Sequence, residues 1–215
     1  MHPFCRVLGL SAVILLTSCD PSESRMMKQE QSTAVATAPS TEEIEAKFRQ
    51  NPSPKQAYRV ILDVSNAPGP FASIEGFAQY AAPDCTYVIN EAAGATANPE
   101  KRIPVTYTKQ DDGTYAGIVH ADAMLDEDYF GKGICHWGLV VVSAQMRATG
   151  AQGETRFFAS LDRDALLDGK PQTRVHERKR YPRDSAIADF SSLGLDPPSD
   201  DVFPLTLTSE IVRHD

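Results

Sequence analysis

The densest group of chemically competent side chains in this sequence lies between positions 122 and 128. Four carboxylates fall in this stretch, Asp122, Asp126, Glu127 and Asp128, and three of them are consecutive. Like charges this close together repel one another unless a cation or a basic partner meets them. The stretch is therefore a candidate for binding calcium or a basic protein, and a solvated turn is the third interpretation.

Two kinds of contact can be assigned to these side chains. As a calcium site, Asp122, Asp126 and Asp128 would supply the oxygen ligands that the ion prefers, but their spacing departs from the regular Asp-x-Asp-x-Asp-Gly pattern. We therefore expect neither a metal nor another cofactor, with calcium as the alternative. As a protein contact, the group would comprise Asp126, Glu127, Asp128 and Tyr129 on a protruding loop.

The short motifs of common enzymes are missing. There is no Gly-x-Ser-x-Gly, His-Glu-x-x-His, Gly-x-x-x-x-Gly-Lys or Cys-x-x-Cys. The histidines at 120, 136, 176 and 214 have no helical ligand spacing for zinc. We expect no catalytic residues and no enzymatic activity. A hydrolase acting on glycan or peptide remains an alternative, because paired carboxylates could serve glycoside hydrolysis.

Charge composition excludes another class of function. The 215 residues include 21 Lys and Arg against 29 Asp and Glu, for a formal net charge of −8 and a pI near 5.1. Neutralising nucleic-acid phosphates requires a basic face. We therefore expect no nucleic-acid partner, and an acidic protein is better suited to basic or neutral partners.

The amino terminus predicts export. Arg6 precedes an apolar stretch, Val7 to Leu16, as in a secretory signal peptide, and ten residues are too few to span a bilayer. The run Leu16-Thr17-Ser18-Cys19 resembles the lipobox of bacterial lipoproteins. That resemblance implies that residues 1–18 are removed and that Cys19 becomes the first residue and carries lipid.

A lipoprotein of this kind would be attached to the bacterial cell envelope through the lipid on Cys19 and would face the periplasm. Two or three acyl chains anchor a protein durably, whereas one chain anchors it only marginally. Asp20 occupies the position at which enterobacterial lipoproteins carry a signal for the inner membrane, which favours that membrane. Loss of Arg6 with the leader changes the formal net charge from −8 to −9.

Residues 19–55 are predicted to hold the lipid attachment, a disordered tether and a short helix. From Asp20 to about Thr41 the sequence has no aromatic residue and no sustained period, so it cannot offset its ordering entropy. Such a chain spans on the order of 25 Å. A helix is expected over Glu42 to Gln50, with Ser40 or Thr41 as cap, ending before Pro52.

Residues 56–212 are predicted to form an all-β domain, an antiparallel sandwich or barrel-like structure of about eight strands. Strands with period-2 alternation begin at Tyr58 to Val64, and Asp111-Asp112-Gly113 favours a tight hairpin. One short helix is expected at Leu161 to Asp168, between Ser160 and Gly169. The further predicted strands are Ser73 to Tyr80 with a bulge at Gly76, Cys85 to Ile89, Ile103 to Thr108, Thr114 to Val119, Ile134 to Met146, Glu154 to Ser160, Thr173 to Tyr181 and Phe203 to Thr208.

The four cysteines divide by compartment. Cys5 leaves with the leader and Cys19 carries lipid, so Cys85 and Cys135 remain as a pair in an oxidising space and are predicted to form a disulfide. Along Ile134 to Val141, positions 135, 137, 139 and 141 share one face, which we expect to point inward.

The general plan resembles the periplasmic immunity or inhibitor lipoproteins of antibacterial secretion systems, which neutralise toxins such as cell-wall hydrolases. The resemblance rests on the lipobox and the tether, and over the β domain it is architectural. It implies a binding module whose partner is a periplasmic protein, with a basic hydrolase attracted by the acidic chain. The alternative is an envelope scaffolding or assembly lipoprotein that binds another envelope protein or a cell-wall polymer.

Overall fold

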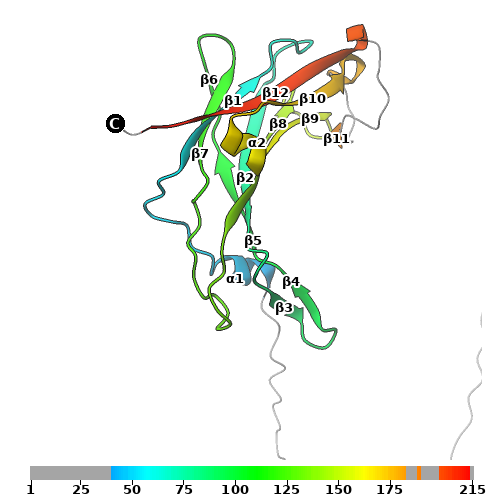
Figure 1. The fold of residues 1–215 in the computed structure, drawn as a ribbon. Coiled ribbons are helices and arrows are strands. Elements are labelled where there is room, and N and C mark those ends of the chain that lie inside the picture. Colours follow the sequence, from blue (N-terminus) through cyan, green and yellow to red (C-terminus); the bar gives the residue numbers. More distant parts are fainter. Residues whose placement is uncertain (1–39, 183–187, 190–198, 214–215) are drawn as a thin grey trace, which may run out of the picture. The chain divides into compact units, whose positions relative to one another are not determined.

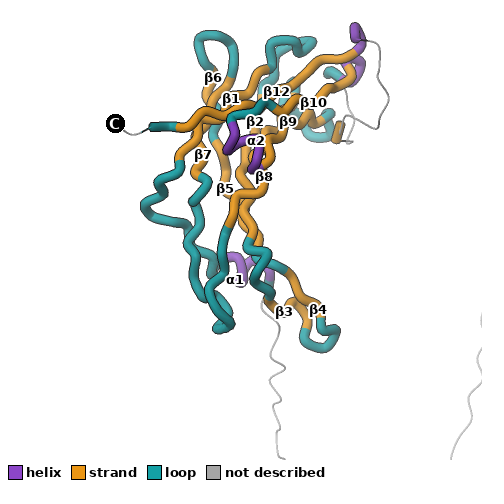
Figure 2. Tube along the Cα trace, viewed as in Figure 1, coloured by secondary structure: helices purple, strands orange, loops and turns teal. Residues whose placement is uncertain are grey.

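The computed structural model describes residues 40–182, 188–189 and 199–213, and this part of the chain is built mainly from β-strands (Figures 1 and 2). The leader, Cys19 and the segment 20–39 lie outside the described residues. No helix within the described ranges is long and apolar enough to cross a membrane.

Two five-stranded sheets and one separate hairpin contain the strands. All pairings are antiparallel except the parallel pairing of β11 with β9. The first sheet has the order β10 (Gln172–Glu177), β12 (Val202–Ile211), β1 (Ala57–Asp63), β7 (Tyr115–His120), β6 (Thr108–Lys109). The second has the order β11 (Ala188–Asp189), β9 (Arg156–Asp162), β8 (Gly138–Arg147), β2 (Ser73–Ala81), β5 (Glu100–Val105). The hairpin pairs β3 (Tyr87–Asn90) with β4 (Ala95–Ala97).

The core lies between the two sheets. Along β12, Phe203, Leu205 and Leu207 are fully buried and alternate with half-buried neighbours, as the period of a strand requires. Phe157 on β9 faces them from the second sheet, with its ring centroid 5.4 Å from that of Phe203. The predicted all-β class is confirmed as two packed sheets, and no sheet among the described strands closes into a barrel.

The first helix, α1 (Thr41–Glu45), is shorter than the predicted one. Ser40 is the cap: its hydroxyl accepts from the Glu43 N–H at 3.2 Å and its N–H donates to the Glu43 carboxylate at 2.7 Å. Beyond the helix, Phe48 is buried in the same core cluster as Ile44. The packed domain therefore starts at or before Ile44 and includes part of the predicted lead-in.

The second helix, α2 (Arg163–Asp168), lies within the predicted span but has a different cap. Ser160 and Leu161 belong to β9, and Asp162 caps the helix by accepting from the Ala165 N–H at 2.9 Å. Gly169 ends the helix in the left-handed region, at φ 68°, as expected for a C-terminal glycine. The described residues thus contain a helix at both predicted places, and each helix is shorter than its predicted span.

A β-bulge shifts the alternation of inward-facing and outward-facing side chains along β8. Gln79 pairs with Val141 and Tyr80 with Leu139, so Val140 is the extra residue on β8. Before the bulge the buried positions are odd-numbered. After it the buried apolar positions are even-numbered, at Val142, Ala144 and Met146.

The expectation that 135, 137, 139 and 141 all point inward is therefore wrong for Val141. Cys135 and Leu139 are buried and Trp137 is half-buried, whereas Val141 follows the bulge and falls out of phase. The bulge predicted at Gly76 is also wrong. Gly76 is in regular register, and a Cβ there would lie 2.5 Å from the Val105 carbonyl oxygen.

The predicted strand Ile103 to Thr108 is split between the two sheets. β5 ends at Val105 and β6 begins at Thr108, so two residues carry the chain from one sheet to the other. The Asp-Asp-Gly hairpin is confirmed between β6 and β7, with Gly113 at φ 87°. The predicted strand Thr173 to Tyr181 is shorter than expected, because β10 ends at Glu177 and Arg178–Arg180 form a 3-10 helix.

Candidate functional site

The predicted disulfide is present between Cys85 and Cys135, whose Cα atoms are 5.4 Å apart. Cys135 is fully buried, and its N–H donates to the Glu127 carbonyl at 2.9 Å. The bond joins the segment that leads into β3 to the end of the 121–137 segment, which runs mostly as loop between β7 and β8 (Figure 2). The carboxylate-rich stretch is therefore held close to the β3–β4 hairpin.

The carboxylate of Asp122 is an internal acceptor. It accepts from the Lys55 N–H at 2.8 Å and from the Gln56 N–H at 3.0 Å. Partial burial would raise the pKa of Asp122, but these two donors outweigh it and hold the pKa below its ordinary value. Asp122 thus ties the 121–137 segment to the approach to β1.

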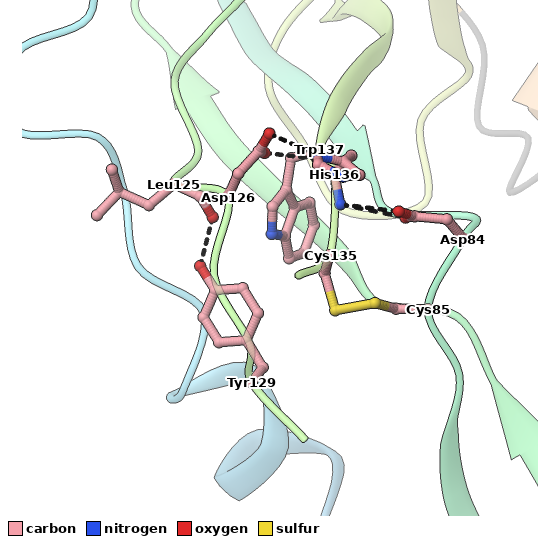
Figure 3. A network of polar contacts seen from close by, with 8 residues as sticks. All are labelled: Asp84, Cys85, Leu125, Asp126, Tyr129, Cys135, His136 and Trp137. Carbon is pink, nitrogen blue, oxygen red and sulfur yellow. Dashed lines mark hydrogen bonds and ion pairs between the residues drawn. A yellow bond between two sulfur atoms is a disulfide. The ribbon is translucent and has the colours of Figure 1, made fainter. Parts of the chain in front are cut away.

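Asp126 organises the segment after Cys135 (Figure 3). One carboxylate oxygen accepts from the Trp137 N–H at 2.9 Å and the other lies 3.0 Å from Nδ1 of His136. Both oxygens of Asp84 accept from the His136 N–H, at 3.2 Å each. The hydrogen bond to Asp126 raises the pKa of His136, and the charges of Asp126 and Asp84 act in the same direction. The His136 and Asp126 side chains remain exposed.

Asp128 and Glu127 also have partners within the described residues. Asp128 accepts from the N–H groups of Phe130 at 3.2 Å and Lys132 at 3.0 Å. Backbone donors in this turn hold the pKa of Asp128 below its ordinary value against the opposing effect of burial. Glu127 accepts from Nε of Arg49 at 2.7 Å and forms an ion pair with that guanidinium.

Tyr129 faces inward. Its hydroxyl donates to the Leu125 carbonyl at 2.6 Å, and its ring packs edge-on against Phe48 and Trp137, with centroids 5.4 and 6.2 Å away. Of the four predicted contact residues, Asp126 and Asp128 are exposed, while Glu127 and Tyr129 make internal contacts. Hydrogen bonds and ring contacts therefore hold residues 126–129 against their surroundings, while the side chains of Asp126 and Asp128 stay accessible.

The calcium alternative has no geometric counterpart. No group of three or more His, Cys, Asp or Glu in the described parts of the chain is arranged to hold a metal ion. The carboxylates of Asp122, Asp126 and Asp128 accept from different backbone N–H groups and do not converge.

A small cavity lies between β5 and β7. Its volume is about 110 Å³, and Tyr80, Ile103, Ile118 and His120 are among the lining residues. Sites for drug-sized molecules are typically about 300 to 1,000 Å³. This cavity therefore offers room for water-sized occupants and is no candidate for a larger ligand.

The β3–β4 hairpin is the exposed feature that sequence reasoning missed. The strand was predicted as Cys85 to Ile89, but its partner β4 was not, and neither was the exposure of its apolar side chains. Val88 and Ile89 are 39% and 46% exposed. The available signal was an Asn-Glu-Ala-Ala-Gly turn directly after two β-branched residues.

The described chain is thus an all-β sandwich with a disulfide at the base of a separate hairpin and an acidic, internally bonded segment beside it. No protein-family model, curated protein or solved structure matches the chain. The functional assignment therefore rests on the sequence and on this geometry.

Proposed function

We propose that this chain is a lipid-anchored protein of the bacterial cell envelope whose β domain binds a periplasmic protein. In this proposal it acts as an immunity or inhibitor protein against a secreted, cell-wall-degrading toxin. The anchor is the lipid on Cys19, and Asp20 favours the inner membrane. The domain itself supplies binding and no catalysis.

The observation that carries the proposal is how the cysteines are used. The lipobox ends at Cys19, and Cys85 and Cys135 are bonded to each other. Stable disulfides belong to oxidising compartments such as the periplasm, which is where a lipobox would deliver the chain. Two independent features of one sequence therefore favour the same compartment.

Charge supports the kind of partner. The processed chain would carry a formal charge of −9, and Asp126 and Asp128 are exposed on the segment next to the disulfide. Complementary charge speeds encounter and selects partners. A basic enzyme that acts on the cell wall has the matching sign.

The anchor is tested by labelling the full chain with a fatty acid in its bacterial host. We expect labelled protein in the membrane fraction and no label on a Cys19→Ala variant. A Cys5→Ala variant is the matched control, because that residue lies in the leader and its loss leaves labelling unchanged. Persistent labelling of the Cys19→Ala protein would refute the lipid anchor.

The binding role is tested by chemical crosslinking in intact cells, followed by purification of the lipidated chain. Recovery of a cell-wall hydrolase, encoded beside this chain's own gene, supports the immunity assignment. Recovery of envelope assembly proteins without a hydrolase would replace it with a scaffolding role. Because the attraction is electrostatic, adding about 0.5 M salt before crosslinking is expected to lower the recovery.

A further inference from the structure

The β3–β4 hairpin presents an apolar surface to solvent. Val88 and Ile89 on β3 are 39% and 46% exposed, and Ile134, next to the disulfide that holds the hairpin, is 57% exposed. β3 and β4 pair with each other and with neither five-stranded sheet (Figure 1). An isolated two-stranded hairpin is marginally stable in water, and grouped exposed apolar side chains mark interaction surfaces.

The base of this hairpin is held in place by three kinds of contact. The disulfide fixes Cys85, and the Asn98 side-chain amide donates to the Cys85 carbonyl at 2.5 Å. The Tyr87 ring stacks on Phe130, with centroids 5.4 Å apart and planes 21° apart. A surface fixed before binding loses little conformational entropy when it binds. The hairpin is therefore built as a preorganised element, although its end contributes nothing to the core.

Carboxylates are frequent in the two chain segments that carry these apolar side chains. Segments 84–91 and 122–136 together contain six Asp and Glu, one Lys and one His. Asp84, Glu91, Asp126 and Asp128 are exposed. An apolar centre with a charged rim is the usual organisation of a protein interface, in which the rim selects the sign of the partner's charge.

We infer that the exposed apolar side chains of this region, Val88 and Ile89 on the hairpin and Ile134 beside the disulfide, dock on the protein partner, and that this partner presents an apolar pocket edged by Lys and Arg. The inference rests on the proposed binding function and names the surface that performs it. The acidic rim favours a protein over a bilayer as the occupant, because anionic lipids attract basic and not acidic segments.

The test places a photo-crosslinking amino acid in the full lipidated chain, in its host, at Val88 or at Val175. Val175 lies on β10 and has the same exposed fraction, 39%, so it is a matched control. We expect one protein, with net positive charge, to be crosslinked from position 88 and not from position 175. The adduct yield from position 88 is expected to fall at least about tenfold with Ile89→Asp and to stay within about twofold with Ile211→Asp, another exposed site.

Each other outcome has a definite meaning. Lipid adducts from position 88 would show a membrane contact and overturn the inference, as would an adduct with an acidic protein. Protein adducts from position 175 alone would also overturn it while leaving the proposed binding function intact. Absence of protein adducts at both positions would overturn the inference, and it would defeat the binding function as well if chemical crosslinking in intact cells also recovered no partner. Unchanged unfolding midpoints of the Asp variants verify that they fold.

Discussion

Tyr80 is buried and Tyr107 is half-buried, and their hydroxyl groups differ in whether they have a hydrogen-bond partner. Burial raises the pKa of both Tyr80 and Tyr107, because it disfavours the phenolate. The Tyr80 hydroxyl donates to the His120 carbonyl at 2.7 Å. The Tyr107 hydroxyl has no hydrogen-bond partner among the described residues. The same chemical group is therefore satisfied in one place and unsatisfied in the other.

Replacing each tyrosine with phenylalanine should separate these two situations. Tyr80→Phe leaves the His120 carbonyl unpaired and is expected to lower the free energy of unfolding by about 1 to 2 kcal/mol. Tyr107→Phe removes an unpaired polar group and is expected to be neutral or stabilising by up to about 1 kcal/mol. Urea unfolding of both variants measures this. Equal losses for the two would contradict the assigned contacts.

His136 gives the domain a pH-dependent contact. Because the hydrogen bond to Asp126 raises its folded-state pKa, the contact stabilises fully below the unfolded pKa, about 6.5, and is lost as the pH rises through the folded value. We expect an NMR titration to give a lower pKa for His136 in an Asp126→Asn variant. The stability difference between wild type and His136→Gln should be present at acidic pH and vanish at alkaline pH. An unchanged titration in the Asp126→Asn protein would argue against the pair.

At the scale of single residues the sequence identified chemically prominent side chains but not the contacts they make. Asp122 and Asp126 are chemically prominent because of their density in the chain. The backbone donors to these carboxylates, Lys55 and Trp137, are brought near only by the fold, and Lys55 is 67 positions from Asp122. Local spacing carries no record of such contacts, so the internal hydrogen bonds of this segment could not be predicted.

Among the elements, β2 depends on a close approach at Gly76. A Cβ at this position would overlap the Val105 carbonyl and the Tyr107 ring, whereas one at Gly138 on β8 would have its nearest neighbour, an Arg163 nitrogen, at 3.9 Å. Gly76→Ala is expected to destabilise the domain by about 1 to 3 kcal/mol. Gly138→Ala is the control and should change stability by less than about 1 kcal/mol. Comparable thermal midpoints for the two variants would refute the crowding at Gly76.

The disulfide supports the hairpin that carries the proposed docking surface. Its cysteines are 50 positions apart. Replacing Cys85 and Cys135 together with Ala should lower the free energy of unfolding by roughly 3 to 4 kcal/mol in the chain-entropy model. Denaturant unfolding measures the loss, and non-reducing peptide mapping of secreted wild-type protein should show one linked pair. Two free thiols in that protein would contradict the assignment.

Period-2 alternation was enough to predict most strands, but not the bulge in β8 or the place where the chain passes between the two sheets. A half-buried strand can be predicted from the spacing of Phe203, Leu205 and Leu207 alone. Val140 cannot be recognised as a bulge, since its apolar neighbours fit either phase equally well. The point after Val105 at which the chain passes from one sheet to the other cannot be predicted either, because the alternation of apolar residues continues unchanged through Tyr107.

For the whole molecule, the proposed anchor and the proposed docking surface act together. A chain of about 20 residues joins Cys19 to Ser40, where the described domain begins. Tethering raises the effective concentration of a binding site to roughly the millimolar range for partners at the same membrane. A docking surface of modest area could then intercept a toxin at the place where it acts.

The activity we propose for this chain is neutralisation of a basic cell-wall hydrolase, which it binds through the hairpin. The most direct test measures the enzymatic activity of the hydrolase that crosslinking identifies. The hydrolase is purified without a crosslink and titrated with the full lipidated chain in detergent. We expect activity to fall to a residual level at one molar equivalent, and Ile89→Asp to require at least about tenfold more protein. Full hydrolase activity at saturating wild-type chain would contradict the claim.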